Sequence, residues 1–522
     1  MISTVRRADR LFAATGAATA LIALGTGANA QSAPVSTAPG DAQPRPPATA
    51  PADPRDAKIE QLEIEVRQLA AEVEDLKAGE ANGIKQIQAD QQQQTAQKAR
   101  PEIGLTNARP QITTSNGAFS FALRSVVQFD AAHYDVSPTP TGTFASGTDF
   151  RRARFGFDAT AYNDWNFSLW GEFGGSGGES ASLNQAYIEY AGLKPFKFAD
   201  AFRLRAGAWA TPAGLDDATP NTELLFLERP AVEEMVRGLD AGDAREGAGV
   251  FATGSRWYFS GVLTSRVAGV SAPPVYGQQA AYLARFAFNP LHGKDYDVHL
   301  GGAVQGVITP AATGASGPAA ETLTLNQQPE LRVDANGTKL VSTGAIDASS
   351  MTTYSAEAGA SFRNLYVAGE YYWIDVDRTA IGTGTTPSPF NPSFSGWYVQ
   401  GAWTLTGERR IWSPGNGGFR GIFRPDHNFD LREGGWGAWE IAARYSVLDL
   451  NDDAGLFGHT APTGGVRGGV QKITTVGLNW YPNPVIRFLL DYQNGHVDRL
   501  STAGGDIGAH FNNVSFRSQF AF

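Results

Sequence analysis

Three arginines stand close together in residues 149–157, which read DFRRARFGF. A guanidinium is a permanent cation whose fixed donors match the oxygens of phosphate and carboxylate groups. The stretch alternates apolar and polar residues, as a half-exposed β-strand does. In that alternation Arg152 and Arg154 share the polar face, whereas Arg151 falls on the apolar face. The chemistry this predicts is anion binding, and it requires elements with one wet face and one apolar face.

From residue 117 to the C-terminus, alternating segments of this kind recur between turn residues. The predicted strands are 119–133, 149–161, 165–174, 182–191, 202–210, 245–253, 256–264, 279–289, 296–306, 352–361, 365–375, 394–406, 436–449, 468–481, 485–494 and 510–522. Short turns such as 363–364 alternate with long loops such as 307–351, the pattern of a barrel inserted from the periplasm. The predicted fold is therefore all-β, a 16-stranded antiparallel transmembrane β-barrel. The connection 407–435 is longer than its place among the short turns predicts.

The last predicted strand indicates which parity faces lipid. In 510–522 valine and phenylalanine alternate with polar side chains, and the chain ends on a phenylalanine. A charge on the lipid face at mid-bilayer costs about 2–4 kcal/mol, so strand charges should point into the lumen. The arginines predicted to line the pore and bind anions are Arg124, Arg152, Arg154, Arg203, Arg205, Arg285, Arg444, Arg487 and Arg517. Arg151 has lipid-face parity near the outer end of its strand, where we expect it to reach the headgroups.

Inward arginines allow two interpretations. Along a water-filled pore they would attract anions. Paired with carboxylates of the lumen, they would stiffen the barrel and give no selectivity. The carboxylates with lumen parity are Asp130, Asp158, Glu172, Glu189, Glu370, Glu440 and Asp491.

The N-terminal part of the chain has a different composition. The predicted parts are a signal peptide at 1–30, a Pro/Ala-rich linker at 31–56, a coiled coil at 57–80, a polar linker at 81–116 and the barrel domain at 117–522. The signal combines a basic start, an alanine-rich apolar stretch and a small-x-small cleavage site. The short coiled-coil helix has apolar residues at heptad spacing, β-branched at a and leucine at d, which on sequence alone favours two strands. A single amphipathic helix lying on a surface is the alternative.

Composition narrows the function classes. The formal charge of −10 argues against a nucleic-acid partner. The chain has no cysteine and its seven histidines show no ligand spacing, so no metal and no cofactor are expected. Residues 174–178 fit G-x-S-x-G, but they form a glycine loop after a strand instead of a strand–turn–helix. No catalytic residue is predicted, and the chain is not expected to be an enzyme.

Seven blocks of the barrel domain carry a further signal. They are DFRRARFGFDATAYNDWNFSLWGEF, NQAYIEYAGLKPFKF, RLRAGAWATPAGLDD, LLFLERP, FSGWYVQGAWTLTGERR, GGWGAWEIAARYSVLDL and VGLNWYPNPVIRFLLDY. Together they resemble the phosphate-selective porin O and P family over most of 117–522. The resemblance implies a trimeric 16-stranded porin, often with an N-terminal coiled coil, in which a long 407–435 connection is normal. It also implies an arginine ladder that includes Arg151, Arg152 and Arg154, and a constriction loop at 211–244 that folds inward.

The constriction loop 211–244 departs from the phosphate-binding pattern of that family. It has no lysine, and it has two arginines against eight carboxylates. The residues predicted at the constriction are Asp216, Asp217, Glu223, Arg229 and Arg237. Such a loop would repel phosphate unless the wall arginines dominate across the pore.

The sequence therefore favours a porin of the bacterial outer membrane, for passive diffusion of small solutes, leaning to anions such as phosphate or polyphosphate. A general porin without anion selectivity is one alternative. A barrel anchor with a coiled-coil tether to the cell envelope is another. The expected partners are small anionic solutes, outer-membrane lipid and further copies of this chain in a homotrimer.

Overall fold

The computed structural model describes residues 54–98, 101–106, 108–138, 144–175, 181–194, 200, 202–242, 244–268, 275–313, 321–379, 390–422 and 424–522. The predicted signal peptide, most of the Pro/Ala-rich linker and Ser176 of the G-x-S-x-G stretch lie outside these ranges. The chain divides into two compact units, residues 1–89 and 90–522.

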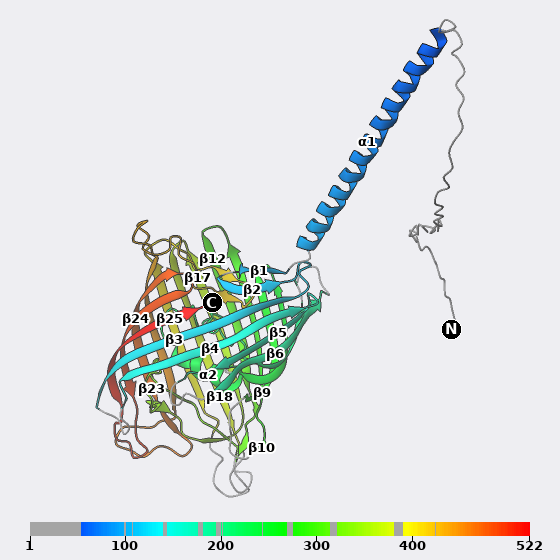
Figure 1. Cartoon of the computed structure of the whole chain (residues 1–522). Coiled ribbons are helices and arrows are strands. Elements are labelled where there is room, and N and C mark those ends of the chain that lie inside the picture. Colours follow the sequence, from blue (N-terminus) through cyan, green and yellow to red (C-terminus); the bar gives the residue numbers. More distant parts are fainter. Residues whose placement is uncertain are drawn as a thin grey trace, which may run out of the picture. The chain divides into compact units, whose positions relative to one another are not determined.

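The N-terminal region contains one long helix, α1 (Pro54–Lys98) (Figure 1). It continues past the predicted coiled coil at 57–80, because the alanine-, lysine- and glutamine-rich sequence that follows has high helix propensity. The hairpin of β1 (Glu102–Thr106) and β2 (Arg109–Thr113) comes next, and β2 pairs with the first barrel strand. The polar linker predicted at 81–116 is therefore wrong over most of its length. No helix among the described residues is long and apolar enough to cross a membrane.

Sixteen strands of unit 90–522 form a closed antiparallel barrel (Figure 1). They are β3 (Ser120–Ser137), β4 (Gly147–Ala161), β5 (Trp165–Glu172), β6 (Ser182–Leu193), β7 (Phe202–Trp209), β8 (Arg245–Gly254), β9 (Trp257–Val267), β11 (Ala280–His292), β12 (Tyr296–Thr309), β17 (Ile346–Phe362), β18 (Leu365–Arg378), β19 (Ser393–Thr404), β22 (Ala438–Asp452), β23 (Val466–Asn483), β24 (Ile486–Asp498) and β25 (Ala509–Ala521). Each pairs with the next, and β25 pairs with β3 from His510↔Ser137 to Ala521↔Val126. The predicted number of strands and the predicted fold are confirmed.

The two ends of the barrel differ in their connections. At one end β4 and β5 are joined by a tight turn in which Tyr162 and Asn163 have φ of 52° and 66°. The turn between β17 and β18 is equally tight, with Arg363 at φ 51°. Most long loops lie at the other end, and the connection from β19 (Ser393–Thr404) to β22 (Ala438–Asp452) is the long one at this end. Short turns mark the periplasmic end of an outer-membrane barrel and long loops mark the outer end.

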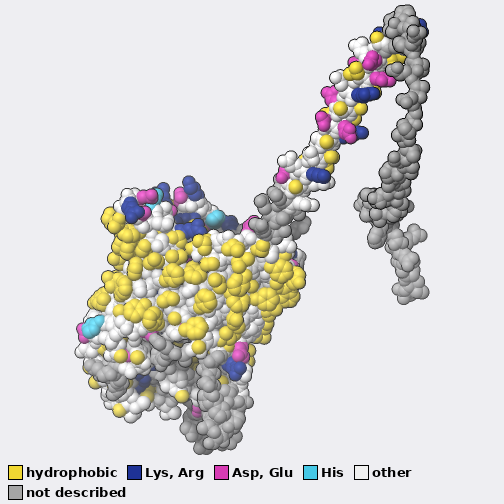
Figure 2. All heavy atoms as spheres, viewed as in Figure 1, with side chains coloured by type: hydrophobic (Ala, Val, Ile, Leu, Met, Phe, Trp, Pro, Cys, Tyr) yellow, Lys and Arg dark blue, Asp and Glu magenta, His cyan; other side chains and the backbone are white. Residues whose placement is uncertain are grey.

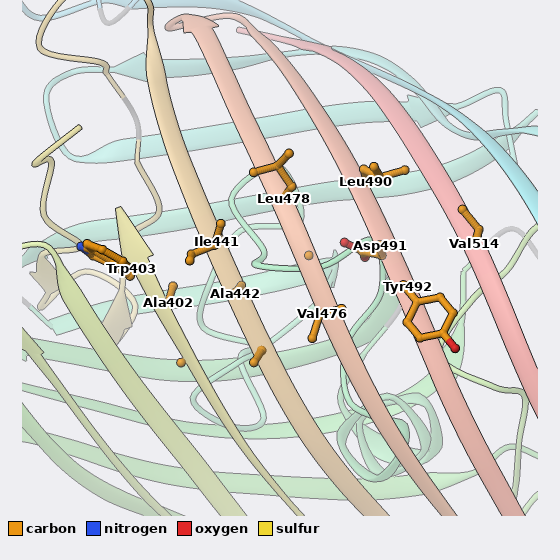
Figure 3. Close-up of a pocket in the computed structure, with 13 residues that line it drawn as sticks. Ala402, Trp403, Ile441, Ala442, Val476, Leu478, Leu490, Asp491, Tyr492 and Val514 are labelled. Carbon is orange, nitrogen blue, oxygen red and sulfur yellow. The ribbon is translucent and has the colours of Figure 1, made fainter. Parts of the chain in front are cut away.

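The outer surface carries a broad band of hydrophobic side chains (Figure 2). Alternation places these side chains outward: Leu490 and Tyr492 are 47% and 44% exposed, whereas Asp491 between them is 1% exposed. Figure 3 shows Leu478, Leu490 and other apolar side chains of β19 to β25 lining one shallow part of this outer face. The last strand follows the same rule, with Phe516 and Phe520 outward and Arg517 inward, as predicted, whereas Phe511 has lumen parity and is buried.

Arginine substituted for Val476 should destabilise the barrel by about 2–4 kcal/mol, because Val476 is outward-facing in the interior of β23. Val470 provides the control on the same strand. It also faces outward, but it pairs with Asp449 and Asp498 near the outer end. There the cost of an arginine should fall to about 0–1 kcal/mol. Urea-induced unfolding in lipid vesicles measures the free energy of unfolding of both variants. Equal costs would contradict the assigned depth of Val476.

Three segments fold into the lumen and fill much of it. The first is the constriction loop, which contains α2 (Ala231–Asp240). The second, here called the second inward loop, spans 321–345 and contains the short strands β14 (Thr322–Leu323), β15 (Asn326–Gln327) and β16 (Val341–Ser342). β13 (Ala312–Thr313) precedes it in the chain. The third, the periplasmic inward segment, spans 407–424 and contains β20 (Trp412–Ser413) and β21 (Gly418–Phe419). A further short strand, β10 (Val275–Gly277), pairs with β13.

A hydrophobic core holds the first two inward segments against the wall. Val232 and Val236 of α2 are fully buried with Leu325 and Val341 of the second inward loop, and inward side chains of β18, β22 and β23 complete the cluster. The burial of α2 follows from its sequence, because its apolar residues lie on one face. The predicted inward fold of the constriction loop is seen in the structure.

Candidate anion pathway

Arg151 faces the lumen, and the predicted position at the lipid headgroups is wrong. The pairing of β3 with β4 shifts at this point: Gln128 pairs with Arg152 and Phe129 with Phe150. Arg151 is the extra residue of a β-bulge, and a bulge re-aims the side chains of its strand. Its guanidinium contacts Glu228 of the constriction loop, with Nε–Oε1 2.7 Å and Nη2–Oε2 3.1 Å. All three arginines of DFRRARFGF therefore point inward.

Three guanidinium groups lie within 4.0 Å of the carboxylate of Glu228. Besides Arg151, Arg517 donates to Oε1 at 3.1 Å, and an Arg152 nitrogen lies 4.0 Å from Oε2. Burial alone would raise the pKa of Glu228, but the three cations hold that pKa well below its ordinary value. Arg152 also donates to the side chain of Gln128 at 2.7 Å, and its buried Nε has no hydrogen-bond partner among the described residues. Arg517 also pairs with Asp130, so three guanidinium groups meet two carboxylates here and positive charge is in excess.

A cavity of about 480 Å3 lies between the wall of β3 to β7 and the constriction loop. Nine arginines line it and only three carboxylates do, so its lining has a clear positive excess. The arginines are Arg109, Arg124, Arg151, Arg152, Arg154, Arg205, Arg229, Arg237 and Arg487. The carboxylates are Asp217, Glu223 and Glu234. The lining also includes Phe522 and the turn at 483–485, so the cavity extends to the periplasmic end.

Five of the nine predicted pore arginines line this cavity: Arg124, Arg152, Arg154, Arg205 and Arg487. Three of them, Arg124, Arg154 and Arg205, are each held by a carboxylate of lumen parity. Arg205 contacts Glu189 at 2.7 Å, Arg154 pairs with Glu172, and Arg124 lies 3.4 Å from Asp158. Such pairs fix the position of a guanidinium without removing it from the cavity.

The other four predicted arginines do not line it. Arg285 makes a bidentate pair with Glu357, at 2.8 and 2.9 Å, and also donates to carbonyls of the periplasmic inward segment. Arg517 pairs with Asp130 at 2.7 Å. Arg444 pairs with Glu330, and Arg203 lies over the ring of Phe251. For Arg285, Arg444 and Arg517 the ion-pair interpretation is the one that the structure bears out.

Most carboxylates of the constriction loop form ion pairs with arginines or do not line the cavity. Asp216 is 4% exposed, contacts Arg229 at 2.9 Å and accepts from Gln400, so it does not line the cavity as predicted. Asp217 lies between Arg229 and Arg237, at 3.2 and 2.9 Å. Glu223 is bound by Arg420 of the periplasmic inward segment. The repulsion expected from an acidic loop is therefore largely neutralised in place.

Several residues of the site were missed by the sequence interpretation. Arg109 lies in the stretch predicted as a linker, and Arg420 lies in the connection whose length was unexplained. Glu330 of the second inward loop accepts from Ser446 at 2.6 Å and from the backbone amide of Ala231 at 2.8 Å, and it also pairs with Arg444. These contacts join segments far apart in the chain, so no local pattern could indicate them.

A closed barrel with an apolar outer band and an arginine-lined interior cavity is a porin of the bacterial outer membrane, and its lining favours anions. The chain belongs to the phosphate-selective porin O and P family, whose family model matches residues 121–522.

The chain is also similar to several individual proteins. Porin O of Pseudomonas aeruginosa is 25% identical over 408 residues, which cover 76% of this chain and 87% of that protein. An uncharacterized protein of Caulobacter vibrioides is 27% identical over 437 residues, which cover 77% of this chain and 76% of that protein. Among solved structures, the trimer form of OmpT of Vibrio cholerae has a TM-score of 0.44 at 12% identity, covering 78% of this chain and 100% of that one. An anion-selective porin from Comamonas acidovorans has a TM-score of 0.42 at 12% identity, covering 77% of this chain and 100% of that one.

Proposed function

We propose that the arginine-lined cavity is the selective part of the permeation path, and that the protein passes small oxyanions, phosphate among them, by passive diffusion. The observation that carries this proposal is the excess of nine arginines over three carboxylates in the cavity lining. Fixed cations around a wet, narrow passage lower the energy of an anion and raise that of a cation. No catalytic step is required, because the concentration gradient drives transport.

The arrangement of the arginines suits conduction better than tight binding. Arg154, Arg205 and Arg229 each have a carboxylate neighbour that reduces their net field. Conduction requires sites favourable enough to attract an ion and weak enough to release it. Arginines from four strands of the wall and from the constriction loop face one cavity, so an oxyanion can exchange one guanidinium for the next while it moves.

The proposal includes assembly as a homotrimer, with lipid of the outer membrane covering the apolar band. The heptad residues of α1 support an assembly role for that helix, because they are 47–66% exposed, and burial against other helices would remove them from water. They are Ile59, Leu62, Val66, Leu69, Val73 and Leu76. A tether of the barrel to the cell envelope through α1 is the second candidate role that this exposed stripe favours.

The proposed selectivity predicts a specific result in planar bilayers. Across a potassium chloride gradient, the purified full chain should give a reversal potential with the sign of anion preference. Phosphate added to the bath should then reduce the chloride current, because the two anions compete for the same guanidinium groups. A reversal potential with the sign of cation preference would contradict anion selectivity. Anion preference without any block by phosphate up to tens of millimolar would leave a general anion porin.

A further inference from the structure

A second cavity, of about 640 Å3, lies at the outer end of the barrel, away from the pore cavity. Its lining comes from four regions: the end of the second inward loop at 342–347, the end of β18, the stretch 461–467 and the loop 499–507. A volume of this size is typical of sites for small organic ligands. It exceeds what a single chloride ion would need.

Three arginines line this outer cavity, namely Arg378, Arg467 and Arg499, against one carboxylate, Asp347. In the described part of the chain none of the three forms an ion pair. Asp347 is exposed, and no side-chain bond joins it to them. The cavity wall also presents hydroxyl groups, including those of Thr379, Ser501 and Thr502. Three cations without a paired carboxylate, surrounded by hydroxyl donors, are suited to an oxyanion.

The hydrogen bonds of these arginines show which of them can reach a ligand. Arg467 donates only to main-chain carbonyls of two outer loops, among them Ala454, His459 and Ser501, so it organises the cavity wall. Arg499 donates to the carbonyl of Ser342 at 2.8 Å and to that of Leu340 at 3.2 Å, which leaves one hydrogen on each terminal nitrogen.

Arg378 is the least satisfied of the three. Its Nη2 donates to the carbonyl of Gly464 at 2.8 Å, and its buried Nε has no partner among the described residues.

Burial lowers the pKa of Arg499, and no neighbouring carboxylate acts to raise it. Carbonyl oxygens carry only partial charge, so the positive charge of the cavity stays uncompensated. Arg378 and Arg499 are partly buried, and leaving such charges without a counter-ion has a cost that an anionic ligand would remove.

We propose that this outer cavity binds the phosphate group of a molecule larger than orthophosphate, with Arg378 and Arg499 as the groups that contact it. The ligand can be a soluble phosphorylated compound or the phosphorylated headgroup of an outer-leaflet lipid. The two share the same chemistry, because both present a multiply charged oxyanion at the outer end of the barrel. The site is independent of the selectivity proposed for the pore.

The test uses pyrophosphate as the probe and isothermal titration calorimetry on the purified full chain at low salt. The wild type should show a class of sites that is lost in Arg378→Gln/Arg499→Gln and kept in Arg152→Gln/Arg154→Gln. Since a hydrogen bond to a charged group is worth about 1.5–3 kcal/mol, binding at this class should weaken by roughly tenfold or more. The control is Arg266→Gln, an exposed arginine near the outer end that pairs with Glu246 outside this cavity.

The lipid source has its own readout, the amount of phosphorylated lipid that copurifies with each variant, measured by native mass spectrometry. Loss of bound lipid in Arg378→Gln/Arg499→Gln alone would support the site with lipid as its source. Unchanged pyrophosphate binding and unchanged lipid in that variant would overturn the proposal. Thermal unfolding followed by circular dichroism checks that the variant folds. Arg499→Lys, which keeps the charge with fewer donors, should bind with intermediate strength.

Discussion

Replacing Arg151 and Arg152 together with glutamine is expected to remove most of the anion preference. Both line the cavity, and both lie on the bulged part of β4 that faces the constriction loop. At an effective dielectric constant near 20, a unit charge about 8 Å from an ion contributes about 2 kcal/mol to that ion's energy. The anion-to-cation permeability ratio should therefore fall by roughly tenfold or more, even after screening by salt.

Glu228 makes the expected effect larger. In the wild type it contacts Arg151 and Arg517, and it lies near Arg152. With two of these cations gone, its negative charge would be only partly compensated beside the cavity. The triple variant Arg151→Gln/Arg152→Gln/Glu228→Gln separates the two contributions. It should recover part of the lost anion preference, because it removes the carboxylate as well.

The matched control for this prediction is Arg203→Gln. Arg203 belongs to the same wall and has lumen parity, but it does not line the cavity and it stacks over Phe251. Its loss should change the reversal potential little. If Arg203→Gln shifted the reversal potential as much as the double variant, general lumen charge would set selectivity. If the double variant left the potential unchanged, Arg151 and Arg152 would serve only to hold Glu228.

The barrel could be predicted because its signals are local. Strand alternation has a period of two, so a misplaced boundary leaves the facing of Arg205 or Arg517 unchanged. Arg151 shows the limit of that rule. One extra residue in β4 reverses the parity, and neither the three arginines nor their apolar neighbours reveal where the partner strand shifts its register. The register of the pairing with β3 decides which way Arg151 faces, and that register cannot be inferred from the sequence of β4 alone.

The interior of the lumen could not be predicted for a different reason. The second inward loop has no strong periodicity, and it is held by contacts such as Gln471 with the Gln328 carbonyl and Gln493 with the Glu330 carbonyl. Each joins residues more than 140 positions apart. The net charge of the constriction loop did not predict its field for the same reason, because some of its carboxylates are neutralised by arginines of other segments, as Glu223 is by Arg420 and Glu228 by Arg151.

Substituting alanine for Glu330 should produce the largest loss of order in the lumen. Glu330 is 3% exposed and joins the second inward loop to α2 and to β22 through Ala231, Arg444 and Ser446. The start of α2 has no side-chain cap of its own, so this carboxylate supplies both a hydrogen bond and a negative charge at the helix N-terminus. Its removal would also leave Arg444 buried without its counter-ion, which typically costs about 3–5 kcal/mol.

The expected consequence is that α2 and the second inward loop lose their fixed positions while the barrel stays closed, because the sixteen-strand ladder does not involve Glu330. Hydrogen exchange at the first amides of α2 should accelerate strongly, and the open-channel current should become noisier. Glu330→Gln, which keeps the shape but not the charge, should have a smaller effect of the same sign. The control is Glu246→Ala, which breaks an exposed pair with Arg266 worth about 0–1 kcal/mol. Unchanged amide protection in Glu330→Ala would mean that the hydrophobic cluster around Val232 and Leu325 holds the two inward loops by itself.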